Sequence, residues 1–266
     1  MNKTEKPTIS QFSKNRKNIQ LFLGEGHRKH KVHAFLELDV TKAKTTIHDL
    51  KKQNIDISFT GWLIKCIADS LISHPQLNSH KQGKNHLITY NTVDIAMAIE
   101  RKTQTETRPL GYILRNADTK KIDEITTEIR TIQQQEIKKD TILLGNTLSP
   151  LEQWVTNAPL FLKKIALRIL RNSGKRKQKY MGTASVTSIG MKGYFPGWII
   201  PLGGTTTSLF AIGGITKKPG VKNNQIAICD YLHMTITIDH DIVDGGPLAR
   251  FVDDLTTKIE HGYALP

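Results

Sequence analysis

Residues 232–251 read LHMTITIDHDIVDGGPLARF, and their first half alternates apolar with polar side chains. The apolar residues occupy every second position: Leu232, Met234, Ile236 and Ile238. This period of two is typical of a half-buried strand. The same parity places His240 on the apolar face, where burial disfavours the charged imidazole. The segment therefore predicts a strand that presents a neutral histidine able to accept a proton near pH 7.

A turn and a helix follow this strand. Pro247 suits the first turn of a helix, and apolar residues then recur at helical spacing: Leu248, Phe251, Val252, Leu255 and Ile259. Asp244 stands in the turn, where it could pair with a cation and so orient the loop. We expect His240 and Asp244 at a junction between a strand and a helix. A hydrogen-bonded core histidine is the alternative interpretation of the same pattern.

The composition of the 266 residues is that of a globular protein, with 38% hydrophobic and 23% charged residues. The sequence contains no run of 18 apolar residues, and its start lacks the apolar segment of a secretory signal. Cys66 and Cys229 lie far apart without zinc-ligand spacing. These features predict a cytoplasmic protein of one domain. The formal net charge of +14 favours an anionic partner, although the 6% aromatic content argues against stacked nucleic acid.

Upstream patterns predict one continuous α/β domain. A strand is expected over 31–40, because apolar residues alternate there with polar ones, and a helix over 58–74 ends at Pro75. The other expected elements are a helix over 42–53, a hairpin of strands 86–90 and 93–100, a strand over 110–114 and a helix over 118–132.

Residues 146–180 form a basic, insertion-like segment. Its apolar residues are Leu160, Phe161, Leu162, Ile165, Ala166, Leu167, Ile169 and Leu170, and residues 163–179 add eight Lys or Arg without an acidic residue. Two interpretations stay open. The segment forms a helix packed against its own domain or a neighbour, or residues 160–179 contact an anionic membrane surface.

The run ITIDHDIVDGGPLARFVDDLTTKIE resembles the end of the catalytic domain of the 2-oxo acid dehydrogenase dihydrolipoamide acyltransferases, whose superfamily includes chloramphenicol acetyltransferase. Residues 35–42, 93–100, 114–125 and 182–193 resemble other segments of that family in order and spacing. The resemblance implies an α/β, chloramphenicol acetyltransferase-like two-layer sandwich, with a mixed sheet and helices on one face. It also implies an N-terminal arm over 1–15 and a catalytic domain over 16–266.

The resemblance assigns roles to individual residues. His240 matches the general base that deprotonates a thiol, and Thr187 falls on the position of the hydroxyl that stabilises the oxyanion. Asp244 matches a structural aspartate, for which Arg16 is the candidate ion-pair partner. The resemblance further implies a homotrimer whose active sites lie between subunits.

Coenzyme A is the implied cofactor, as the acyl-coenzyme A substrate. We expect Arg108, Arg115, Ser188 and Gly245 to contact it, because its phosphates attract basic residues. No metal site is predicted, since basic residues within HRKHKVH (27–33) repel a cation.

Residues 108–113 and 146–180 depart from the family pattern, and no lipoyl or subunit-binding domain is expected upstream. The chain should therefore carry no covalently bound lipoyl group and should meet any lipoyl group on a separate carrier protein. We expect an acyltransferase that moves an acyl group between coenzyme A and an unidentified thiol or hydroxyl acceptor. The alternative is a catalytically silent relative that acts as an assembly module or an anionic-membrane binding module, with no nucleic acid partner.

Overall fold

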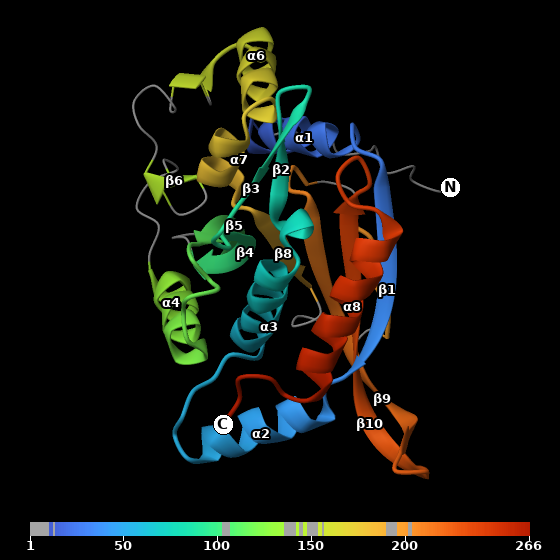
Figure 1. Ribbon diagram of the computed structural model, residues 1–266. Helices are drawn as coiled ribbons and strands as arrows, with labels where there is room; N and C mark the ends of the chain where they lie inside the picture. The colour runs from blue at the N-terminus through green and yellow to red at the C-terminus, as the bar shows by residue number, and fades with distance from the viewer. Residues whose placement is uncertain are drawn as a thin grey trace, which may run out of the picture.

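The computed structural model describes residues 11–12, 14–102, 107–135, 142–143, 146–147, 154–155, 157–189, 196–201 and 204–266. A six-stranded mixed sheet runs through its centre in the order β1-β10-β9-β8-β4-β5 (Figure 1). The strands are β1 (Lys31–Asp39), β4 (Ile95–Lys102), β5 (Thr107–Leu114), β8 (Ala184–Ser188), β9 (Ser208–Lys222) and β10 (Gln225–Asp239). Strand β8 is parallel to both β4 and β9, and the other pairs are antiparallel.

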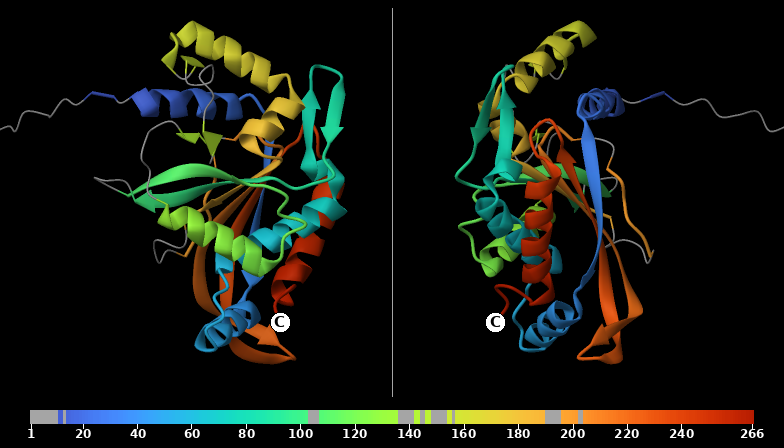
Figure 2. Two further views of the ribbon diagram at one scale, coloured as in Figure 1. Left: turned by 90° about the vertical axis from the view of Figure 1, so that its left-hand side faces the viewer. Right: turned by 45° about the vertical axis from the view of Figure 1, so that its right-hand side comes forward.

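Helices pack on one face of this sheet (Figure 2), as predicted. They are α2 (Thr41–Lys52), α3 (Phe59–Ser73), α4 (Ile122–Gln134) and α8 (Gly245–Glu260). The hydroxyl of Ser58 accepts a hydrogen bond from the Gly61 amide at 3.2 Å and so fixes the start of α3. Buried side chains fill the space between the two layers, among them Trp62, Ile95, Phe210, Ile236 and Phe251. The two-layer sandwich is therefore confirmed.

Both cysteines lie inside this structure with free thiols. Cys66 is buried in α3, and burial raises the pKa of its thiol to about 12. Cys229 is buried on β10. The indole of Trp62 donates a hydrogen bond to the carbonyl of Tyr263 at 2.8 Å, which ties the C-terminal residues to α3.

The predicted hairpin of strands 86–90 and 93–100 is wrong. β3 (His86–Thr89) pairs instead with β2 (Ser79–Gln82), which follows the short 3-10 helix η1 (Pro75–Asn78), and β4 joins the central sheet. The side-chain amide of Asn78 donates to the carbonyls of Tyr90 and Thr92, and these bonds hold the connection between β3 and β4. Alternation along a strand identifies its faces but does not choose its partner, so the sequence pattern could not separate the two arrangements.

One end of the molecule gathers α1 (Lys14–Gly26), α6 (Leu160–Arg171), α7 (Gly174–Met181) and the β2-β3 hairpin (Figure 1). The basic segment predicted as one helix is thus two helices, broken at Asn172 and Ser173. The Ser173 hydroxyl accepts from the Arg176 amide and starts α7. Helices α6 and α1 are joined by an ion pair between Arg171 and Glu25, 3.0 Å apart. Strands β6 (Ile142–Leu143) and β7 (Asn146–Thr147) pair with each other in a small separate sheet.

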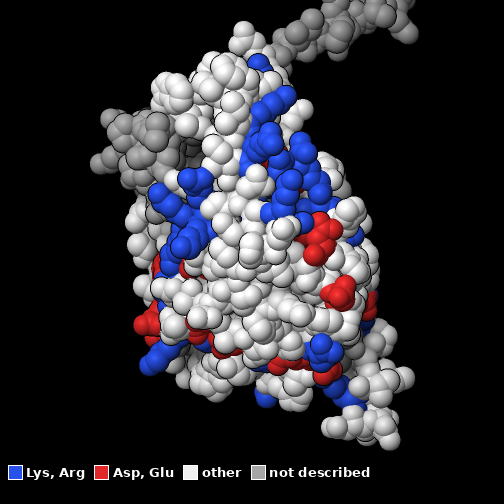
Figure 3. Space-filling view, turned by 45° about the horizontal axis from the view of Figure 1, so that its top comes forward, with Lys and Arg blue, Asp and Glu red and all other residues white. Residues whose placement is uncertain are grey.

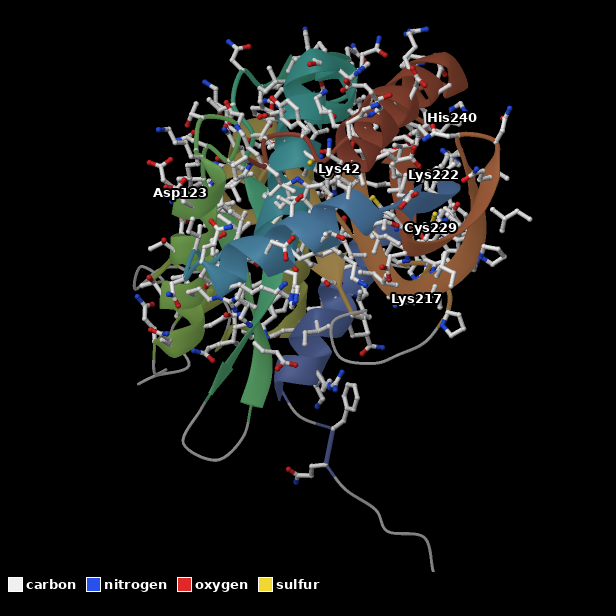
Figure 4. The ribbon with its side chains drawn as sticks, turned by 90° about the horizontal axis from the view of Figure 1, so that it is seen from below. Lys42, Asp123, Lys217, Lys222, Cys229 and His240 are labelled. Carbon is white, nitrogen blue, oxygen red and sulfur yellow. The ribbon has the colours of Figure 1, made fainter. Side chains whose placement is uncertain are left out.

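At the opposite end, β9 and β10 extend beyond the sheet as a hairpin (Figure 1). Figure 4 places Lys217, Lys222 and Cys229 on this hairpin, on the side of the molecule away from Asp123 of α4. Apolar side chains stand out into solvent here: Val221 is 75% exposed, Ile226 83% and Ile228 75%. Such an apolar projection is typical of a surface that meets another protein.

The second face of the sheet carries side chains that alternate with the core residues. Val186 of β8 faces the core, so its neighbour Thr187 faces the other side. Residues 196–201 lie against part of this second face. The ring of Trp198 packs on His233 and Phe35, and its indole donates to the carbonyl of Leu36 at 2.9 Å.

Candidate active site

His240 lies one residue beyond the end of β10. Its amide donates to the carbonyl of His30 at 2.7 Å, which fixes the backbone. The side chain is 46% exposed, and Nδ1 lies 3.7 Å from Oδ1 of Asp244. The prediction that His240 extends the buried face of the strand is therefore wrong. The strand ends at Asp239, whose carbonyl accepts from the Val243 amide at 3.1 Å, and this turn rotates the next side chain out of the strand alternation.

Asp244 precedes α8, and its side chain is 84% exposed. Its Oδ1 lies 3.7 Å from Nδ1 of His240, and none of the ion pairs between described residues joins Asp244 to Arg16. Arg16 lies on the exposed surface of α1. Gly245 is the first residue of α8, and a Cβ added there would meet no atom within 4 Å. The space beside Gly245 is thus open to solvent.

A buried framework beneath His240 holds this turn in place. The ammonium of Lys29 lies 3.0 Å from Oδ2 of Asp239 and donates to the carbonyls of Thr205 and Thr206. Burial lowers the pKa of Lys29, while the charge of Asp239 opposes that change. Sequence reasoning missed this role, because the basic run at 27–33 was considered only as a metal site.

His30 supplies a second contact to the turn. Its Nδ1 lies 2.8 Å from Oδ1 of Asp241. The hydrogen bond to Asp241 raises the pKa of the His30 imidazole and lowers that of the carboxyl group. His240 is therefore flanked on both sides, at positions 239 and 241, by acidic residues paired with basic ones.

Thr187 lies in a different part of the chain's surface. It pairs with Ala211 of β9, and Ala211 pairs on its other side with Thr235 of β10. His240 is five residues further along from Thr235, which corresponds to about 17 Å along the strand at about 3.3 Å per residue. One chain therefore does not bring Thr187 and His240 together.

Ser188 follows Thr187 on β8, with the opposite parity. Its hydroxyl is buried and has no hydrogen-bond partner among the described residues. A buried hydroxyl without a partner costs free energy. Its orientation toward the core does not support the predicted contact with coenzyme A.

Arg115 has a structural role. Its guanidinium lies 2.8 Å from Oδ2 of Asp94 and also donates to the carbonyls of Gln178 and Lys179. These bonds tie α7 to the end of β5. Arg108 belongs to β5, opposite Arg101, and its side chain lies outside the described residues. No group of three or more potential metal ligands occurs in the described part of the chain.

The family model described as 2-oxoacid dehydrogenases acyltransferase (catalytic domain) matches residues 4–142 and 162–265. The chain belongs to this family. The match leaves residues 143–161 between its two segments. This acyltransferase domain is also similar to curated relatives. It is 25% identical over 232 residues to the dihydrolipoyllysine-residue acetyltransferase component of the pyruvate dehydrogenase complex of Rickettsia bellii, covering 85% of this chain and 46% of the relative.

A second relative is the dihydrolipoyllysine-residue succinyltransferase component of the 2-oxoglutarate dehydrogenase complex of Buchnera aphidicola, 22% identical over 210 residues, which are 79% of this chain and 41% of the relative. The acyltransferase domain thus spans less than half the length of these two relatives. Within the described residues, no helix is both long enough and apolar enough to cross a membrane.

Solved structures share the fold of this acyltransferase. The probable dihydrolipoamide acetyltransferase of Listeria monocytogenes has a TM-score of 0.68 at 20% identity, covering 97% of this chain and 96% of that one. The dihydrolipoamide acetyltransferase of Azotobacter vinelandii, studied for the catalytic roles of a serine, a histidine and an asparagine, has a TM-score of 0.68 at 16% identity, covering 97% and 93%. A chloramphenicol acetyltransferase has a TM-score of 0.50 at 13% identity, covering 96% of both chains. The predicted chloramphenicol acetyltransferase-like fold is confirmed.

Proposed function

We propose that this chain transfers an acyl group between coenzyme A and a thiol, with His240 as the general base. One observation supports this most directly: the imidazole stands half exposed at a rigid turn, with Nδ1 toward Asp244. Nε2 is then the nitrogen available to a substrate. Because the turn is held by the ion pairs of Asp239 and Asp241, the ring needs little reorganisation before it reacts.

The proposed reaction is a thioester exchange. Nε2 of His240 takes the proton of the attacking thiol, and the thiolate sulfur forms a bond to the carbonyl carbon of the acyl thioester. The carbonyl electrons move to oxygen, and the hydroxyl of Thr187 donates a hydrogen bond to this oxyanion. The tetrahedral intermediate then collapses, the first carbon–sulfur bond breaks, and the imidazolium returns its proton to the departing thiolate.

A second copy of the chain completes this site in our proposal. Thr187 and His240 of one chain are about 17 Å apart along the sheet by strand geometry, so the hydroxyl must come from a neighbour. The exposed apolar hairpin of β9 and β10 offers a surface for such a contact. A closed homotrimer, in which each subunit gives His240 to one site and Thr187 to the next, satisfies this requirement.

The acceptor that we propose is a dihydrolipoyl group on a separate carrier. The curated relatives are named as dihydrolipoyllysine acyltransferases. In the Azotobacter vinelandii enzyme the catalytic histidine and asparagine are four residues apart, the same spacing as His240 and Asp244. The serine and histidine studied there correspond in kind to the hydroxyl and imidazole groups proposed here.

The test is an assay of acyl transfer from a panel of acyl-coenzyme A donors to free dihydrolipoamide. We expect the His240→Ala variant to lose transfer while the assembly keeps its size in solution. His48→Ala is the matched control, because His48 is an exposed histidine on α2, outside the site. Full activity of His240→Ala would refute the proposed base.

A second function is favoured by α6, whose apolar side chains face solvent. Leu160 is 56% exposed, Phe161 62% and Ile165 52%, and basic residues line the same helix. We propose anionic membrane binding by this helix as the alternative to catalysis. Flotation with vesicles that contain an anionic lipid tests it. Binding that is lost at high salt and absent with neutral vesicles supports this function, and no flotation with anionic vesicles excludes it.

A further inference from the structure

A cavity of about 310 Å³ opens at the end of the molecule that carries α1, α6 and α7. The turn that holds His240 forms one of its walls, through Asp239 and Asp241. Figure 3 shows Lys and Arg side chains gathered over this end of the molecule. We name the cavity the basic pocket; its basic lining residues are Arg28, Lys29, Lys81, Lys84, Arg171 and Lys177.

Acidic side chains neutralise only part of this lining. Lys29 pairs with Asp239, and Arg28 and Arg171 both pair with Glu25. Among the described residues, no carboxylate forms an ion pair with any of three lining lysines: Lys81, Lys84 and Lys177. The basic pocket therefore has excess positive charge around an open volume.

Lys177 is the most constrained of these three cations. It is only 6% exposed, and no hydrogen bond to its ammonium group is formed by the described residues. The charges that act on it are the cations Lys29, Arg171 and Lys81 and one carboxylate, Asp239, which is already paired with Lys29. A buried cation without a counter-ion is costly, and proteins normally place an anion beside it.

The pKa of Lys177 is consistent with its burial without a counter-ion. Burial, together with the charge of Lys29, lowers the pKa of Lys177 to about 8. The nearby imidazole of His80 is 1% exposed, and burial together with the charge of Lys177 holds its pKa well below the usual range. The imidazole of His80 is therefore neutral and adds no charge near Lys177.

We propose that the basic pocket binds a phosphate group, with Lys177 at its base and Lys81 and Lys84 at its rim. A phosphate monoester carries a charge of about −1.5 to −2 at pH 7 and several acceptor oxygens, which matches three unpaired ammonium groups. A single carboxylate would leave two of them uncompensated. The volume is at the lower end of the range for small-molecule pockets, about 300–1,000 Å³, so a phosphate with an organic substituent also fits. This proposal stands independently of the acyl-transfer function.

Thermal unfolding of the full chain in sodium phosphate, against sodium chloride of equal ionic strength, tests the proposal. We expect phosphate to raise the Tm of the wild-type protein and of Lys175→Met, an exposed lysine on the same helix. We expect Lys177→Met to bind phosphate about 10- to 100-fold more weakly, the loss of one charged hydrogen bond. An equal response of wild type and Lys177→Met, or no response of the wild type beyond that in chloride, would overturn it.

A second variant tests the proposal even if Lys177→Met fails to fold. Lys81→Met with Lys84→Met changes only exposed residues of the β2-β3 hairpin, so the fold should persist while phosphate binding weakens. Unchanged phosphate affinity in this double variant would also refute the proposal.

Two further ligands identify the source of the phosphate group. If coenzyme A supplies it from its 3′-phosphate, coenzyme A should bind more tightly than 3′-dephospho-coenzyme A, and Lys177→Met should abolish that difference. If the group is inorganic phosphate or another phosphate monoester, both forms of coenzyme A should bind equally while phosphate still stabilises the protein. His240→Ala should respond to phosphate like the wild type, which separates a failure of this proposal from a failure of the proposed acyl transfer.

Discussion

Thr187 of β8 and His240 beyond β10 lie on opposite sides of β9, five residues out of register with each other. The two groups proposed for one reaction therefore belong to two copies of the chain. A mixture of two inactive variants tests this arrangement. When His240→Ala and Thr187→Val subunits assemble together at random, about one quarter of the sites should combine an intact histidine with an intact threonine.

The measurement is the acyl-transfer rate of co-expressed subunits, compared with each variant assembled alone. Recovery of about a quarter of the wild-type rate is expected. Separately assembled variants, mixed only after assembly, are the control and should stay inactive. A mixed assembly that is as inactive as its parents would contradict a site shared between subunits.

Substitutions at position 187 separate the hydroxyl from the shape of the side chain. Thr187→Ser keeps the donor and should stay within a small factor of the wild-type rate. Thr187→Val keeps the shape and removes the donor, so kcat should fall by about 10² to 10³. Steady-state kinetics on both variants measure this difference. Equal kcat values for Thr187→Ser and Thr187→Val would exclude the role of the hydroxyl as an oxyanion donor.

Arg115 should matter for stability. Its partner Asp94 is buried and also accepts from the Asn116 amide at 3.0 Å. Arg115→Met leaves that carboxylate buried without its cation, which should lower the free energy of unfolding by about 2–3 kcal/mol after allowance for the partly exposed guanidinium. Denaturant unfolding measures the loss. A raised KM for coenzyme A with unchanged stability would instead support the sequence-based prediction of a coenzyme A contact.

Lys177 makes the stability depend on pH in an unusual direction. An unfolded lysine titrates near pH 10.5, whereas Lys177 in the folded chain titrates near pH 8. Between these values the unfolded chain holds one more proton, so the free energy of unfolding should rise with pH, by at most about 3 kcal/mol from this residue. Below pH 8 both states are charged, and the cost of burying the cation is felt in full.

Comparison with Lys177→Met isolates this contribution, because the variant has no group that titrates there. In buffer without phosphate, the stability of the wild type relative to the variant should increase from pH 7 to pH 10. A constant difference across that range would show that the lysine is not desolvated.

The sequence predicted the elements of the fold better than their partners. Alternating and four-residue periods located β1, α3 and the junction before α8, because local burial patterns encode faces. They did not show that β3 pairs backward with β2, since strand pairing depends on contacts between distant segments. The break at Asn172 and Ser173 was missed for a related reason: a serine can cap a helix or lie within one.

The site was predictable in its residues but not in its geometry. The spacing of His240 and Asp244 in the sequence predicted that they share a turn. In the structure, Nδ1 of His240 lies 3.7 Å from Oδ1 of Asp244. The alternation of side chains along β10 could not predict that His240 is exposed, because the strand ends at Asp239, one residue before it. Lys29 was overlooked, since its role depends on Asp239, some two hundred residues away in the sequence.

The two cysteines have a practical consequence. Both thiols are buried, and that of Cys66, with its pKa raised to about 12, stays protonated at any ordinary assay pH. Because only the thiolate is strongly nucleophilic, a disulfide dye such as 5,5′-dithiobis(2-nitrobenzoic acid) should scarcely react with the native protein. The native chain should therefore add little background to a colour assay of free thiols, and a sudden burst of dye consumption would report unfolding.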